Sequence, residues 1–215
     1  MRRMTNLWLL LLALAIGAAS LAPGGGPPPA APPQTNAPEP APPPASRPAS
    51  ITETIELEGM EEPISLRLYE DAALGFTTYI PEWLEAASSS SGEGDGFLAT
   101  AAFGGVPEPR SAFGLFRPAG TYTRETIAAY AKELQRASGF TVEAYSEDAP
   151  PRFPGSVEEF GITKIDEADG FGVIGTVALL ERDGRWIIVT IRYLEDHAEG
   201  FVPRAMKIYE HLQWH

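Results

Sequence analysis

The sequence FGVIGTVALLERDGRWIIVTIRYL, residues 171–194, decides the fold of this chain. It contains two apolar segments, 171–180 and 186–194, on either side of the dipeptide Asp183-Gly184. A strand with one face in water alternates apolar and polar residues, and neither segment alternates in this way. Asp-Gly favours a tight hairpin turn because it supplies the positive φ angles that such a turn needs. The stretch therefore predicts a central antiparallel hairpin that is covered on both faces.

The segments outside this hairpin predict further strands and two helices. Thr123 is a good N-cap for a helix that Gly139 ends, and an apolar stripe predicts a second helix over residues 201–214. Residues 88–96 lack an apolar anchor and predict a loop, while Pro81 suits a helical turn over 81–84. The strands are expected at 51–58, 64–69, 74–80, 97–103, 112–116, 140–145 and 157–165.

The order of these elements indicates an α+β fold with one central antiparallel sheet. Because the hairpin at 171–194 has two apolar faces, each face needs a covering layer. We therefore expect a central antiparallel sheet with cover on both faces, and the resemblance described below implies that helices provide this cover, as in an α/β/α sandwich.

The first fifty residues predict export and a spacer rather than a folded domain. Residues 1–20 have a cationic start, an apolar core and small residues at Ala19 and Ser20, the pattern of a signal peptide. An uncleaved anchor over residues 7–22 is the alternative. Residues 21–50 are rich in proline and alanine and predict a disordered linker, followed by a single α/β domain over 51–215. The protein is thus expected to be secreted or extracytoplasmic, with membrane contact only through that anchor.

Composition excludes several classes of function. The chain has 215 residues and a formal charge of −13, which argues against nucleic acid and anionic membranes as partners. It has no cysteine, and this excludes disulfides, thiolate chemistry and cysteine-bound zinc. Most of the acidic surplus lies after residue 50, where it favours a solvated surface over a site for cations.

A short motif in the predicted third strand gives a resemblance to a known family. Residues 75–83, GFTTYIPEW, resemble the opening of bacterial PsbP-like domains, which are similar in fold to the Mog-type proteins. The order of strands and helices up to Trp214 is consistent with this resemblance. It implies an extracytoplasmic member with the α/β/α sandwich and a binding or assembly role. No functional residue of the family has a counterpart here.

The motif search predicts no catalytic residue, no cofactor and no metal site. The sequence lacks a nucleophile elbow, a Walker loop, a dinucleotide fingerprint and the zinc-protease helix motif. Three histidines lie near the C-terminus, and His197 follows two acids, yet polar decoration of helix ends explains them. The acid-rich turn at 166–170 is shorter than a calcium loop, and turn chemistry explains its Asp169-Gly170.

Aromatic residues at the ends of elements are the better candidates for recognition. Tyr122 and Trp214 lie at such ends and are predicted to bind a partner, whereas Trp186 is predicted to be core. The leading hypothesis is a non-catalytic extracytoplasmic binding or accessory domain for an unknown protein or cell-envelope component. One alternative is an envelope hydrolase that uses carboxylates near His197. The other is a passive structural surface protein without a specific ligand.

Overall fold

The central hairpin is confirmed. Strands β9 (Gly172–Arg182) and β10 (Arg185–Leu194) pair antiparallel through a two-residue turn. Its residues Asp183 and Gly184 have φ angles of 50° and 70°, as this turn requires. Val177 and Val189 are both 0% exposed, and they belong to hydrophobic clusters on opposite faces of the sheet. The two-sided burial of the hairpin is thus also observed.

The computed structural model of the chain describes residues 47–145 and 150–215. The predicted signal peptide lies outside these residues, and so does the predicted linker up to residue 46. The helices are α1 (Arg124–Ala137) and α2 (Ala198–Glu210), with a 3₁₀ turn, η2 (Glu195–His197), before α2. The other strands are β1 (Ser50–Leu57), β2 (Met60–Asp71), β3 (Phe76–Pro81), β4 (Leu84–Ser91), β5 (Gly94–Phe103), β6 (Val106–Pro118), β7 (Thr141–Ala144), β8 (Glu158–Ile165) and β11 (Gln213–Trp214).

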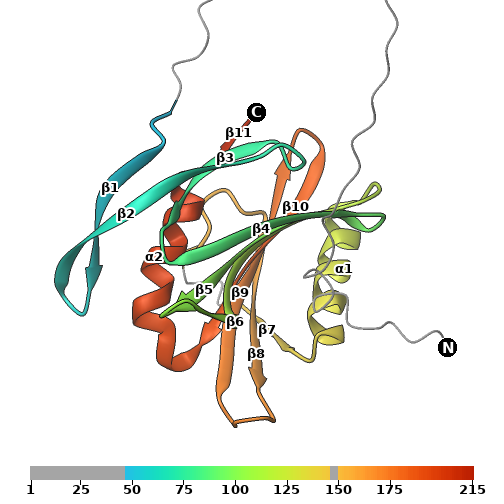
Figure 1. Ribbon diagram of the computed structural model, residues 1–215. Coiled ribbons are helices and arrows are strands. Elements are labelled where there is room, and N and C mark those ends of the chain that lie inside the picture. The colour runs from blue at the N-terminus through green and yellow to red at the C-terminus, as the bar shows by residue number, and fades with distance from the viewer. Residues whose placement is uncertain (1–46, 146–149) are drawn as a thin grey trace, which may run out of the picture. The chain divides into compact units, whose positions relative to one another are not determined.

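These strands form two antiparallel sheets. The larger sheet has seven strands in the order β4-β5-β6-β10-β9-β8-β7, and the smaller has four in the order β1-β2-β3-β11. Figure 1 shows α1 and α2 on opposite sides of the larger sheet. Thr123 caps α1, and its side chain forms a capping box with Thr126. Ile127 and Ala131 of α1 pack in the same cluster as Val177.

The predicted α/β/α sandwich is wrong. Among the described residues, 56% lie in strands and 18% in helices, and the strands form two sheets rather than one. Helices alone do not cover both faces, because on the face toward α2 the smaller sheet shares in the covering. Phe76 and Ile80 of β3 lie in the cluster that contains Val189, beside Phe201 of α2. The pattern of apolar and polar residues in β1, β2 and β3 did not indicate that these strands form a sheet of their own.

Two local predictions are also wrong. The expected loop at 88–96 is part of the β4–β5 hairpin, whose turn is at Gly92 and Glu93. Ser88 of this hairpin hydrogen-bonds Asp71, so polar contacts with β2 replace the missing apolar anchor. The expected helical turn after Pro81 is a tight turn that leads from β3 into β4.

The predicted terminal helix is confirmed only in part. Helix α2 ends at Glu210, and Gln213–Trp214 form strand β11 beside β3. The backbone N–H of His215 donates to the carbonyl of Gly75, which extends the same pairing. None of the helices within 47–145 and 150–215 has the length and apolar content of a membrane span.

Candidate functional site

A bulge in β6 positions the most unusual polar group of the domain. The pairing of β5 with β6 shifts between Thr100 and Ala101, whose partners are Ala112 and Glu108. Three residues of β6, 109–111, therefore have no opposite residue on β5. Bulges of this kind turn side chains out of the regular strand alternation. The bulge places Arg110 and Ser111 at the end of the seven-stranded sheet where β8 turns into β9.

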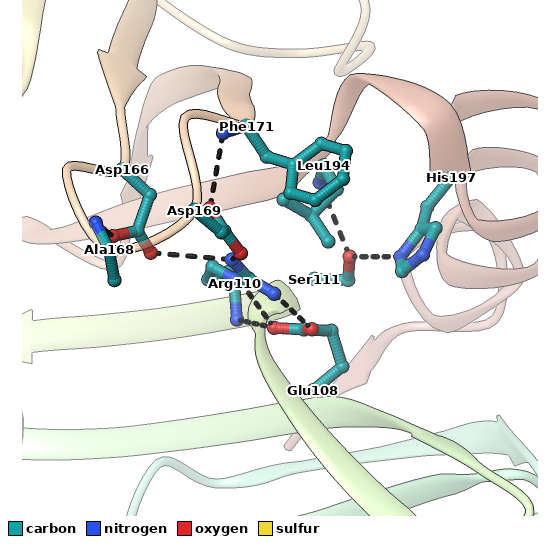
Figure 2. Close-up of polar contacts among 9 residues, drawn as sticks. All are labelled: Glu108, Arg110, Ser111, Asp166, Ala168, Asp169, Phe171, Leu194 and His197. Carbon is teal, nitrogen blue, oxygen red and sulfur yellow. Dashed lines mark hydrogen bonds and ion pairs between the residues drawn. The ribbon is translucent and has the colours of Figure 1, made fainter.

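Arg110 connects β6 to the β8–β9 turn. Its guanidinium donates to Glu108 on the same strand, at 2.8 Å from each carboxylate oxygen. It also donates to Asp166, at 3.3 Å, and to Asp169. Figure 2 shows the three carboxylates around the one guanidinium. Arg110 therefore joins the bulge of β6 to the β8–β9 turn, and three acids share one cation.

This arrangement favours the ionised forms of Glu108 and Asp169. The hydrogen bond from Arg110 is the largest cause that lowers the pKa of Glu108, and His197 adds a smaller attraction. The same arginine is the largest cause that lowers the pKa of Asp169. Conversely, the hydrogen bonds that Arg110 donates to Glu108 and Asp169 raise the pKa of Arg110. A carboxylate whose pKa is lowered by folding stabilises the fold above its unfolded pKa and loses that effect in acid.

We expect Arg110→Met to lower the melting temperature at pH 7, because three carboxylates would then repel one another. The difference from the wild type should begin to shrink below about pH 4, where the acids of the unfolded chain become protonated, and it should vanish once Glu108 and Asp169 of the folded wild type are protonated at a lower pH. Thermal melts from neutral pH to about pH 3 measure this difference.

Arg136→Met is the matched control for this prediction. Arg136 lies on α1, is 56% exposed and has only a 4.0 Å pair with Glu133. Exposed pairs of this kind contribute little to stability. An Arg110→Met effect that is equal at both ends of the pH range, or no larger than the control, would show that the network is not electrostatic.

Ser111 and His197 form a second contact beside Arg110. The backbone N–H of Leu194 donates to Ser111 Oγ at 3.3 Å, and Ser111 Oγ lies 3.1 Å from His197 Nδ1 (Figure 2). Ser111 thus links the start of the η2 segment to the His197 ring, and which of the two atoms donates depends on the tautomer of His197. The His197 ring in turn packs against Phe103, with 4.7 Å between ring centres.

These contacts do not resemble a hydrolase centre. Ser111 is 0% exposed, so its hydroxyl has no route to a substrate. Glycoside hydrolysis needs a carboxylic acid with a raised pKa, and the pKa values of Glu108 and Asp169 are lowered instead. The geometry near His197 therefore favours positioning of neighbouring groups over acid–base catalysis.

The same end of the sheet exposes large apolar side chains. Phe103 and Val106 flank the β5–β6 turn and are 45% and 69% exposed. Ile165 and Phe171 flank the β8–β9 turn and are 65% and 48% exposed. We call these four residues the sheet-end surface. Among the described residues, Met60 on the β1–β2 turn is the one other exposed large apolar residue.

Tyr122, predicted to bind a partner, lies elsewhere in the domain. It is half-buried, and its carbonyl accepts from Trp186 Nε1 at 3.0 Å. Its ring packs against Tyr130, at 5.5 Å between ring centres. It also lines a shallow cleft of about 300 Å³ with Arg117, Asp95 and turn residues. Arg117 in this cleft is already paired with Asp95 at 2.6 Å.

Trp214, the second predicted residue, packs into the fold. Its ring contacts Phe76 at 5.5 Å and joins the cluster around α2. Tyr122 packs against the cluster on the opposite face of the large sheet, so the structure does not bring these two residues together. Trp186 is 8% exposed, in agreement with the prediction that it is core.

The other predicted groups have structural partners. His211 Nε2 lies 2.8 Å from Glu53, and Asp169 bonds Arg110 and the N–H of Phe171. Within the described parts of the chain, no three His, Asp or Glu side chains gather where they would hold a metal ion. Sequence reasoning missed Arg110 and Phe103, although the Pro-x-Pro pattern of residues 107–109 is a signal that a regular strand is interrupted there.

Comparison with known proteins adds no relative. No protein-family model matches the chain, and no curated protein matches it. The resemblance to PsbP-like domains therefore stays a prediction based on residues 75–83, and the sandwich that it implied is not the observed fold.

Proposed function

We propose that the domain is a non-catalytic binding or accessory module that docks a protein partner on the sheet-end surface. The observation that carries this proposal is the clustering of exposed apolar side chains. Four of the five large exposed apolar residues among the described residues flank two turns at one end of one sheet. Single apolar residues scattered over a surface need no explanation, whereas a group on adjoining turns marks an interaction site.

The surroundings of the surface support a preformed docking site. Arg110 in the bulge of β6 bonds Asp166 and Asp169, so the β8–β9 turn that carries Ile165 and Phe171 is held against β6. Phe103 also packs against Trp83, at 5.6 Å between ring centres, and against His197. A partner that binds such a surface loses little free energy to ordering it.

The predicted location outside the cytoplasmic membrane is consistent with a binding or accessory role. Export through residues 1–20 and a spacer over 21–50 would present the domain outside the cytoplasmic membrane, free or tethered. Both segments remain predictions. An accessory domain on a spacer fits this arrangement, and it needs no catalytic residues.

Site-specific photo-crosslinking in the cell of origin tests the proposal. A photoreactive phenylalanine analogue replaces Phe171 or Val106 in the full chain, and Met60 is the matched control. Met60 is 61% exposed and lies in the smaller sheet, at the β1–β2 turn. We expect one discrete adduct from positions 171 and 106 and none from position 60.

Two results would contradict the proposal. Equal adducts at all three positions would show non-specific contact, and no adduct at 171 and 106 would show an unoccupied surface. An adduct of twice the chain's mass would assign the surface to a second copy of this chain instead. Introducing Phe103→Ser into the position-171 protein should weaken the adduct, since both aromatics belong to the sheet-end surface.

A further inference from the structure

We infer that the partner presents a cationic segment with large apolar side chains, and this inference rests on the proposed docking function. The apolar residues of the sheet-end surface would contact the apolar side chains of this segment. Phe103 and Phe171 are both about half exposed, so part of each side chain is open to an apolar side chain of the partner. Aromatic residues of this kind are the usual anchors of protein interfaces.

The acidic side chains around these residues would attract the cationic side chains of the segment. Glu108, Asp166 and Asp169 share the single guanidinium of Arg110. Glu195 lies next to the backbone just after Phe171, because a Cβ atom added at Gly172 would be 2.7 Å from its carboxyl carbon.

Further acids and cations complete the surroundings. Glu167 lies in the β8–β9 turn, and Asp196 lies beside His197, both exposed to solvent. Arg192 donates to the carbonyl of Pro109 at 3.1 Å, and Lys164, next to Ile165, donates to the carbonyl of Ser138 at 3.4 Å. Arg204 lies over the ring of Trp83, which packs against Phe103. Together with Arg110 these are four cations, and the six carboxylates around the sheet-end surface outnumber them.

This surplus of negative charge selects among partners. Nucleic acid and anionic lipid would be repelled, because both require a cationic footprint. A cationic partner gains attraction at the border while its apolar side chains lie on Phe103 and Phe171. Lysine and arginine side chains suit both roles, since their stems lie on apolar surface while their charges reach the carboxylates.

The charge around the surface also predicts how binding depends on salt. Interactions between exposed charges are screened over a Debye length of about 8 Å at physiological ionic strength. The cationic contribution should therefore weaken as salt rises, whereas the apolar contribution persists. A partner held by both contributions loses affinity in salt without losing it completely.

Peptide binding to the full chain tests this inference. The probes are three labelled synthetic peptides of equal length that alternate Leu with Lys, Leu with Glu, and Ser with Lys. Fluorescence anisotropy measures their affinity at about 0.05 M and about 0.5 M NaCl. We expect the Leu-Lys peptide to bind best at low salt, at least about tenfold better than the other two.

Matched variants locate this binding. Glu195→Gln combined with Asp196→Asn removes two exposed charges that do not bond Arg110, and Phe171→Ser removes an apolar anchor. The control, Glu56→Gln combined with Glu61→Gln, removes two exposed charges that face each other on the β1–β2 hairpin. We expect about threefold to tenfold weaker binding for the first two variants and no change for the control.

The results separate this inference from the docking function. Equal binding of the Leu-Lys and Leu-Glu peptides, or equal loss in the control, would overturn the cationic partner. If crosslinks form at positions 171 and 106 but the Leu-Lys peptide does not bind, the docking function stands and the partner's chemistry is wrong. If both experiments fail, the sheet-end surface is not a docking site. Equal affinity for the Ser-Lys and Leu-Lys peptides would show that charge alone attracts ligands.

Discussion

Replacing Val177 or Val189 by Asp is expected to unfold the domain at neutral pH. Both side chains are 0% exposed, and they point to opposite faces of the same hairpin. A buried carboxylate without a partner costs several kcal/mol, which is comparable to the total stability of about 5–15 kcal/mol of a typical domain. Circular dichroism should show loss of the native sheet signal, and thermal melts should lack a cooperative transition.

Val106→Asp is the matched control, because it makes the same change at a residue that is 69% exposed. Its melting temperature should remain close to that of the wild type. If Val177→Asp melts normally while Val189→Asp does not, the face that packs on α1 is open to water. The reverse result would show that the face toward α2 and the smaller sheet is open.

The second large effect is expected for Gly175→Ala. Gly175 lies in the middle of β9, and a Cβ atom there would be 2.3 Å from the carbonyl oxygen of Ile191 and 3.0 Å from the Cα of Arg192. Both atoms belong to the backbone of β10, so they cannot move aside as a flexible side chain would. The strain should lower the free energy of unfolding by about 3 kcal/mol, measured by chemical denaturation.

Gly114→Ala distinguishes this strain from the general effect of adding a methyl group. At Gly114, in β6 of the same sheet, the nearest atom to a new Cβ is Leu98 Cδ1 at 3.4 Å. That atom is the end of a side chain and can adjust, so the loss should stay below about 1 kcal/mol. Equal losses for the two variants would mean that β9 and β10 do not approach as closely as observed.

The central hairpin was predictable because its signal is local. Asp183-Gly184 determines the turn, and the two unbroken apolar runs indicate burial on both faces. Thr123 was identified as a helix cap for the same reason, since capping depends on residues within one helical turn. These features need no knowledge of distant parts of the chain.

The second sheet was not predictable, because its signal depends on distant contacts. Strands β1–β3 have the same alternation whether they join the large sheet or form their own, so residues 51–80 do not distinguish the two cases. The run Ser88–Ser91 shows the same difficulty. Serine has no strong strand preference, and the pairing with β5 and the bond from Ser88 to Asp71 make this segment a strand.

The candidate site was missed because its residues meet only in the fold. Arg110 and Asp169 are far apart in sequence, and neither belongs to a known motif. The sequence interpretation regarded the aromatic residues as candidates for recognition, and the choice of Tyr122 and Trp214 relied on their position near element ends. Such ends pack into the core here, whereas the exposed aromatics Phe103 and Phe171 flank turns.

The strand order has a consequence for how fast the domain folds. In the large sheet, β4-β5-β6 and β7-β8-β9-β10 each follow the chain and form from neighbouring segments, and only the β6–β10 pairing joins them. Pairing between segments so distant in sequence is slow compared with local hairpin formation. The two groups of strands, β4-β5-β6 and β7-β8-β9-β10, should therefore form first and pair with each other late. Until then the apolar edges of β6 and β10 are exposed to solvent. During this interval the chain is most prone to aggregation, so refolding yield should fall as protein concentration rises.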